Sequence, residues 1–287
     1  MIGLLALDLD GTCVTKPDVM PERTRLFLEE AVRQGWGLFF LTGRAFGFAH
    51  QAVNALEVPF WMALQQGSLT LKMPEQTILE ECTLPVSLLD SIDEIARANH
   101  LGMVVYAGFA HQDAAYVVTE GYAPEHLSHI ETLRALRGEA WHEIASWTEF
   151  PADRFPLVKL FGSRESCAKA AAQLTSILNS CRAVRIKDPF HAEYDLVLIT
   201  SREANKGDAI LRLKQRLGQP HLLVIGAGND NNDLTLLEVA DIAIAIEGSP
   251  PALLSIADRI AGPAEQEGLL PALQWAMDRV VRGELSS

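Results

Sequence analysis

Asp8-Leu9-Asp10-Gly11-Thr12 follows directly after an apolar run at residues 2–7. An apolar run that ends in acidic residues and a glycine is typical of a buried strand whose carboxyl end opens into a polar loop. Two carboxylates two positions apart in such a loop can both face the crevice above the sheet where open α/β folds bind ligands. Taken alone, the pattern fits equally well an acidic loop that merely ends a strand.

Helical and strand-like segments alternate on both sides of this loop. We expect a helix from Pro21 to just before Gly35, a strand at residues 36–41, and a second helix that ends near residue 56. The alternation returns after residue 196, with strands at 222–225 and 242–246 and a helix at 234–240. This order predicts an α/β fold with a Rossmann-like parallel-sheet core.

The middle of the chain does not continue this regular alternation of strands and helices. Residues 84–195 contain a helical segment at 86–98 that is followed by separate strand-like runs, such as 103–106 and 157–161. We interpret this part as an inserted α+β domain, so the core would consist of residues 1–83 and 196–287. A chain of 287 residues is long enough for a core with one sizeable insertion.

Composition and charge exclude several classes of protein. With 48% hydrophobic and 21% charged residues, the chain is expected to fold, and no apolar run approaches the ~20 residues of a membrane span. A formal net charge of −13 argues against binding to nucleic acid or to anionic lipid. The four cysteines show no spacing typical of a zinc site or a disulfide framework, so we expect a cytoplasmic protein. No pattern decides the oligomeric state.

Two further segments could hold an anion. Thr42-Gly43-Arg44 offers a hydroxyl, a glycine that permits close backbone approach, and the start of a helix. Lys206 also stands at the expected start of a helix, where a cation is electrostatically disfavoured. Each segment alone has an ordinary structural interpretation, a helix cap or a solvated side chain. Together with the two aspartates, they indicate a site for a phosphoryl group.

The loop Gly226-Ala227-Gly228-Asn229-Asp230-Asn231-Asn232-Asp233 follows the strand at 222–225. Its carboxylate and amide oxygens suit Mg²⁺, which takes hard oxygen ligands and bridges carboxylate to phosphate. A Ca²⁺-binding loop is the competing interpretation, but the closing glutamate of an EF-hand is missing.

In this order and at these strand ends, the four segments resemble the haloacid dehalogenase superfamily of phosphatases. The resemblance implies that Asp8 is the nucleophile and Asp10 the general acid and base. It implies phosphate-binding roles for Thr42, Gly43, Lys206 and Asn232. It also implies a Mg²⁺ site made by Asp8, Asp10, Asn229, Asp230 and Asp233. The insertion resembles the larger cap, of the C2 type, found in the Cof-type or subfamily IIB sugar phosphatases, where the cap sets substrate specificity.

Two positions depart from the family pattern. Asn229 stands where an aspartate usually binds magnesium, so that ligand would be neutral here, and Asp230 is the neighbouring carboxylate that could replace it. Gln66-Gly67 stands where the family commonly has Asn-Gly. The expected consequences of Asn229 are weaker metal binding or a changed metal preference.

The expected function is magnesium-dependent hydrolysis of a small phosphorylated metabolite, a sugar phosphate by resemblance, through an aspartyl-phosphate on Asp8. Two alternatives stay open. A phosphosugar mutase would use the same intermediate but would have to exclude water. A catalytically silent sensor of a phosphorylated metabolite is the second, since Asn229 could weaken the metal site. The sequence does not identify the phosphate ester.

Overall fold

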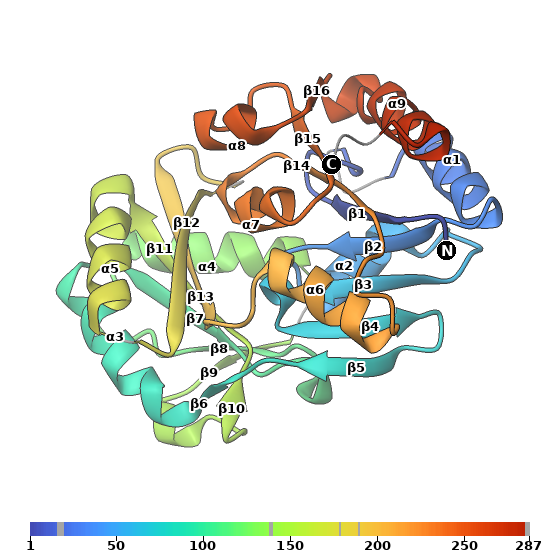
Figure 1. Cartoon of the computed structure of the whole chain (residues 1–287). Coiled ribbons are helices and arrows are strands. Elements are labelled where there is room, and N and C mark those ends of the chain that lie inside the picture. The colour runs from blue at the N-terminus through green and yellow to red at the C-terminus, as the bar shows by residue number, and fades with distance from the viewer. Residues whose placement is uncertain (16–19, 138–139, 178, 189, 285–287) are drawn as a thin grey trace. The chain divides into compact units, whose positions relative to one another are not determined.

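The computed structural model describes residues 1–15, 20–137, 140–177, 179–188 and 190–284, and Figure 1 labels its elements. The chain divides into two compact units. The first comprises Met1–Gly43, Ala49–Glu80 and Asn205–Ser287, and the second comprises Arg44–Phe48 and Glu81–Ala204. Within the described residues, no helix is both long enough and apolar enough to cross a membrane.

An eight-stranded sheet forms the centre of the first unit, in the order β16-β15-β14-β1-β2-β3-β4-β5. Neighbouring strands are parallel from β16 to β3, whereas β4 runs antiparallel to β3. This is the parallel α/β core that the sequence predicted. The strands are β1 Leu4–Asp8, β2 Gly37–Leu41, β3 Phe60–Leu64, β4 Leu69–Met73, β5 Thr77–Glu81, β14 Val224–Gly228, β15 Ile242–Ile246 and β16 Arg259–Ala261.

Helices cover both faces of this sheet because its central strands are apolar on each side. One face, with Leu4 and Phe39, packs against apolar side chains of α6, α7 and α8, and Figure 1 shows α6 and α7 in front of the strands. Contacts of α1 with β2, and of α9 with β14, β15 and β16, cover the rest. These helices are α1 Glu22–Arg33, α6 Lys206–Arg216, α7 Leu234–Glu238, α8 Pro251–Ile256 and α9 Leu269–Arg282. A further helix, α2 Phe46–Val53, begins in the second unit and continues into the first.

The second unit contains a six-stranded sheet in the order β12-β13-β11-β7-β8-β9 and a short pair, β10-β6. Residues of α3 and α5 share one hydrophobic cluster with this sheet, and Ile130 of α4 belongs to a second cluster. The elements are β6 Leu84–Pro85, α3 Leu89–Ala98, β7 Gly102–Tyr106, β8 Ala115–Val117, α4 Pro124–Arg137, β9 Trp141–Glu143, β10 Arg154–Phe155, β11 Leu157–Ser163, α5 Arg164–Ile177, β12 Cys181–Lys187 and β13 Tyr194–Ser201.

The limits of the second unit differ from the expected insertion at residues 84–195. Its main segment begins at Glu81 and continues to Ala204. The expected end at residue 195 falls inside β13, which lies between β12 and β11 in the sheet of this unit. The apolar residues after 195 therefore belong to the second unit and not to the core. Its role as a substrate-specificity cap stays a prediction.

Candidate active site

The carboxyl ends of three central strands bring the predicted site residues together. Asp8 is the last residue of β1 and pairs with Leu41, the residue before Thr42, at the end of β2. On the other side, Leu7 pairs with Ala227 of β14, which leads into the loop that contains Asn229 and Asp233. Because parallel strands end at the same edge of a sheet, segments far apart in sequence meet here.

Lys206 forms the centre of a buried ion cluster. Its Nζ donates to Asp8 Oδ1 at 2.6 Å and to Asp233 Oδ1 at 2.5 Å. The Lys206 and Asp233 side chains are completely buried, and the Asp8 side chain is 6% exposed. The lysine expected to hold an anion beside a carboxylate thus holds two carboxylates, drawn from β1 and from the loop after β14.

Local sequence explains why Lys206 can stand at the start of α6. The preceding Asn205 caps this helix, since its side-chain oxygen accepts from the backbone N–H of Asp208 at 2.9 Å. The two carboxylates offset the unfavourable field that a helix amino end exerts on a cation. Burial alone would lower the pKa of Lys206, but the attraction of Asp233 and Asp8 raises it above its ordinary value, so the ammonium is fully charged.

The ion pair with Lys206 does not fully stabilise the negative charge of the Asp8 carboxylate. Burial, followed by the charge of Asp233, raises its pKa to about 8, while Lys206 acts in the opposite direction and Asp10 adds to the increase. Its second oxygen, Oδ2, is buried and has no hydrogen-bond partner in the part of the chain that the structure describes. A buried carboxylate oxygen without a partner carries a large desolvation cost. A cation bound beside Asp8 would therefore stabilise the charged form of this carboxylate.

Asp233 uses both carboxylate oxygens to fix the loop. Oδ1 accepts from Lys206, and Oδ2 accepts from the backbone N–H groups of Asn229 and Asp230 at 2.8 and 3.0 Å. A Cβ atom on Gly228 would lie 2.5 Å from the Cβ of Asp233. Glycine at this position thus lets the Asp233 side chain lie against the end of β14.

Asn229 and Asp230 point to different partners. The Asn229 side-chain Nδ2 donates to the backbone carbonyl of Asp10 at 2.8 Å. Asp230 instead accepts from the backbone N–H of Asn231 at 2.7 Å and caps the 3₁₀ turn Asn231–Asp233. Of these two residues, it is Asn229 whose side chain contacts the Asp10 carbonyl, one of the expected metal ligands.

The predicted phosphate-binding residues lie at the end of β2 and beside it. Thr42 is fully buried, and its carbonyl accepts from the backbone N–H of Gln66 at 3.0 Å. Asn232 donates from Nδ2 to the side-chain oxygen of Gln66 at 3.1 Å. Gln66 thus links two of the predicted segments, although the sequence assigned it no role. Its place before Gly67, where the resembling family has Asn-Gly, was the available signal.

A metal ion at this location would be bound by oxygen atoms of several chemical kinds. Among the described residues, no three His, Cys, Asp or Glu side chains are grouped to hold a metal ion. The backbone carbonyl of Asp10 and the side chain of Asn229, which contact each other at 2.8 Å, are candidate donors of other kinds. A mixed set of carboxylate, carbonyl and amide oxygens is compatible with Mg²⁺.

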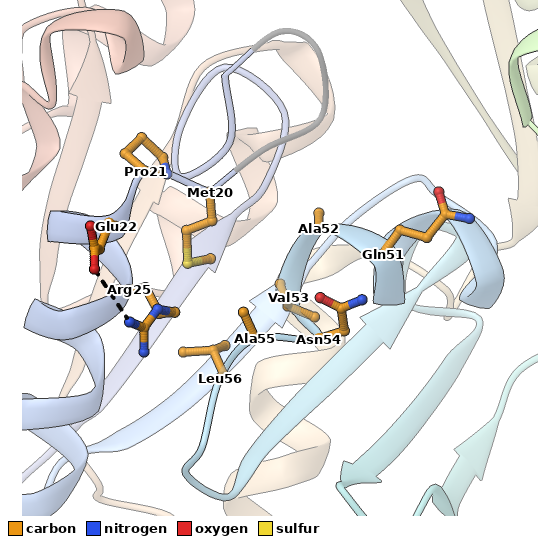
Figure 2. Close-up of a pocket in the computed structure, with 10 residues that line it drawn as sticks. All are labelled: Met20, Pro21, Glu22, Arg25, Gln51, Ala52, Val53, Asn54, Ala55 and Leu56. Atoms are coloured by element: carbon orange, nitrogen blue, oxygen red, sulfur yellow. Dashed lines mark ion pairs between the residues drawn. The ribbon is translucent and has the colours of Figure 1, made fainter.

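A separate pocket of about 420 Å³ lies in the first unit, away from the predicted residues. It is lined by Met20, Pro21, Glu22, Arg25, Gln51, Ala52, Val53, Asn54, Ala55 and Leu56. Figure 2 shows its charged pair, Glu22 and Arg25, facing each other, and Arg25 also donates to Glu29 at 2.8 Å. Its cation is thus already neutralised, and the strand ends with their ion cluster are the stronger candidate for chemistry.

Comparisons with known proteins identify the family of this chain. A pyridoxal phosphate phosphatase of Escherichia coli, YbhA, is 22% identical over 90% of this chain and 93% of its own length. An HMP-PP phosphatase of Serratia proteamaculans is 24% identical over 96% and 95%. The solved structure of BT4131, described as a subclass IIB sugar phosphatase, has a TM-score of 0.73 and 17% identity over 95% of this chain and 98% of its own. The family model for haloacid dehalogenase-like hydrolases matches residues 5–273. The family expected from the four segments is confirmed, and the chain belongs to the haloacid dehalogenase-like hydrolases.

Proposed function

We propose that this protein is a magnesium-dependent phosphatase that hydrolyses a small phosphorylated metabolite through an aspartyl-phosphate on Asp8. The observation that carries the proposal is the buried cluster in which Lys206 bridges Asp8 and Asp233, while Asp8 Oδ2 has no hydrogen-bond partner within the described ranges. An oriented carboxylate with one oxygen committed to a lysine and the other unpaired is suited to act as a nucleophile.

Magnesium fits the residues present. Asp8 Oδ2, the Asp10 carbonyl and the Asn229 side-chain oxygen would hold it, and Asp230 and Asp233 would support the loop from behind. When bound, Mg²⁺ would reduce the repulsion between the Asp8 carboxylate and the negative oxygens of a phosphate ester. The Asn229 amide donates to the Asp10 carbonyl in the free protein. Its side-chain amide would have to rotate so that its oxygen faces the metal.

Each side chain of the proposed site has its own role in the reaction. Asp8 attacks the phosphorus in line, and Lys206 with Thr42 holds the equatorial oxygens of the phosphoryl group. Asp10 is exposed, unlike Asp8, so it can reach the leaving oxygen and protonate it. Once ionised, Asp10 can take a proton from the water that hydrolyses the aspartyl-phosphate.

The substrate proposed is a small organic phosphate, with a sugar phosphate as the first candidate. The relatives reported above are named for pyridoxal phosphate, HMP-PP and sugar phosphate substrates, and the net charge of −13 gives no support for nucleic acid or anionic membrane as a partner. We assign the choice of substrate to the second unit, as its resemblance to a C2-type cap implies.

The test is phosphate release from an aryl phosphate and a panel of sugar phosphates, with Mg²⁺ or with a chelator, by wild type and Asp8→Asn. This substitution keeps the shape of the side chain but removes the nucleophile. We expect release that requires both Mg²⁺ and Asp8, with a loss of at least about a thousandfold in the variant. Transfer of the phosphoryl group to sugar instead of water would indicate a mutase, and no turnover by folded wild type would indicate a sensor.

A further inference from the structure

Gln66 occupies an unusual place beside the predicted phosphate-binding residues. It lies in the 3₁₀ turn Gln65–Gly67 that follows β3, with φ 64° and ψ 26°. Gln65 before it also has a positive φ of 48°. Two consecutive non-glycine residues in this region are strained, and such strain persists where the surrounding structure requires a particular side-chain placement.

The side chain of Gln66 is held at one end only. Its Oε1 accepts from Asn232 Nδ2 at 3.1 Å, and the residue is 6% exposed. The other amide atom, Nε2, is buried and has no hydrogen-bond partner among the described residues. A buried N–H donor without an acceptor destabilises the free protein, because it has given up its hydrogen bonds to water.

The unpaired donor faces the segment expected to bind phosphate. A Cβ atom built on Gly43 would lie 2.4 Å from Gln66 Nε2, so the amide occupies the space beside this glycine. The backbone N–H of Gln66 holds the Thr42 carbonyl, which fixes the turn against the end of β2. Gln66 therefore presents a donor beside Thr42 and Gly43, and Asn232 sets the orientation of that donor.

We propose that Gln66 is a further phosphate-binding residue, whose Nε2 donates to an oxygen of the transferring phosphoryl group. The inference rests on the proposed function and extends it by one residue. An anionic oxygen is the acceptor that this arrangement favours, because Lys206 and Asn232 already supply N–H groups around the same strand ends. Gln66 lies in a strained turn. A bound phosphoryl oxygen would accept a hydrogen bond from its Nε2, which has no partner in the described part of the free protein.

The test uses two substitutions of Gln66 with inorganic phosphate and orthovanadate as probes, in Mg²⁺-containing buffer. Gln66→Glu keeps the oxygen that accepts from Asn232 but replaces the Nε2 donor by a second oxygen. Gln66→Met removes both polar atoms at similar size. We expect inhibition by phosphate and by orthovanadate to weaken at least about tenfold in each variant. KM should rise more than kcat falls for the ester substrates.

A binding readout separates this role from a structural one. Phosphate should raise the melting temperature of wild type but not that of either Gln66 variant. Without phosphate, Gln66→Met should melt no lower than wild type by more than a few degrees, because it removes an unpaired donor together with one hydrogen bond.

The matched control is Gln76→Glu. Gln76 is exposed and also has a positive φ, 54°. It lies beyond Met73, which pairs with Phe60 at the opposite end of β3 from Gln66. The control should behave as wild type in every assay. Wild-type affinity of Gln66→Met for orthovanadate would overturn the inference, even with the phosphatase activity established. Absence of turnover in wild type would instead overturn the proposed function, and phosphate binding would still test Gln66.

Discussion

Replacing Lys206 with methionine tests the ion cluster directly. The substitution keeps most of the apolar stem but removes the ammonium that bridges Asp8 and Asp233 at 2.6 and 2.5 Å. Asp233 and Asp8 would then share a buried site without a counter-charge, and the pKa of Asp8, which Lys206 lowers, would rise further. Hydrogen bonds to charged groups contribute roughly 1.5–3 kcal/mol each, and breaking a buried ion pair from one side costs about 3–5 kcal/mol.

From these values we expect Lys206→Met to lower the free energy of unfolding by about 4 kcal/mol in chelator. For a chain of this size the melting temperature should fall by about 8–16 °C. Thermal and denaturant unfolding at pH 7 measure the effect. Lys214→Met is the control, because Lys214 is buried in the same helix and forms no ion pair with any other described residue. It should shift the free energy of unfolding by less than about 1 kcal/mol.

A double substitution identifies the cause of the loss. If uncompensated carboxylates are responsible, adding Asp233→Asn to Lys206→Met should restore at least about 1 kcal/mol. Equal melting temperatures for Lys206→Met and Lys214→Met would refute the reasoning, because they would mean that the two carboxylates need no counter-charge. Phosphate release should be lost in Lys206→Met at temperatures where the variant is folded.

Two further predictions concern charge in the first unit, one at Glu29 and one at position 229. Burial alone would raise the pKa of Glu29, but the backbone N–H of Glu57 and the guanidinium groups of Arg25 and Arg33 lower it. A lowered carboxyl pKa stabilises the fold above the unfolded pKa of about 4.3 and loses this effect as the pH falls through the folded value. Glu29→Gln should therefore cost about 1–2 kcal/mol at pH 7 and much less near pH 3, measured by denaturant unfolding at both pH values; an equal cost at both would contradict the assignment. Asn229→Asp should tighten Mg²⁺ binding at least about tenfold by calorimetry, and unchanged affinity would place the metal away from this residue.

Much of the core was predictable because its strands are continuous apolar runs. The strand expected at residues 242–246 is β15, Ile242–Ile246, and the helix expected at 234–240 is α7, Leu234–Glu238. The strand β4, Leu69–Met73, was not predicted, since so short an apolar run does not distinguish a strand from other buried segments. Local sequence likewise cannot show which sheet a strand joins, and for that reason the boundary expected at residue 195 falls inside β13.

The helix α4 was missed for a different physical reason. Its buried positions include His126 and His129 together with Ile130 and Leu133. Histidines on the inward face interrupt the apolar period by which a helix is recognised in sequence. Within the site, the motif positions were foreseeable, but their mutual contacts were not. Nothing local indicates that Asp233 receives Lys206 on one oxygen and two backbone N–H groups on the other.

The neutral residue at position 229 changes the charge balance that a substrate meets. Leaving aside Asp230, whose carboxylate caps the turn Asn231–Asp233, the proposed site sets Asp8, Asp10 and Asp233 against the Lys206 ammonium, an excess of two negative charges when all are ionised. One divalent cation would balance that excess. An aspartate at 229 would bind the cation more tightly but leave one negative charge to repel an arriving phosphate dianion. In the proposed site, Asn229 would lower the affinity for the metal and also reduce the repulsion of the substrate. In the free protein its amide donates to the Asp10 carbonyl. On this reasoning Asn229→Asp should show tighter Mg²⁺ binding together with a higher KM, a pairing that a purely structural asparagine would not produce.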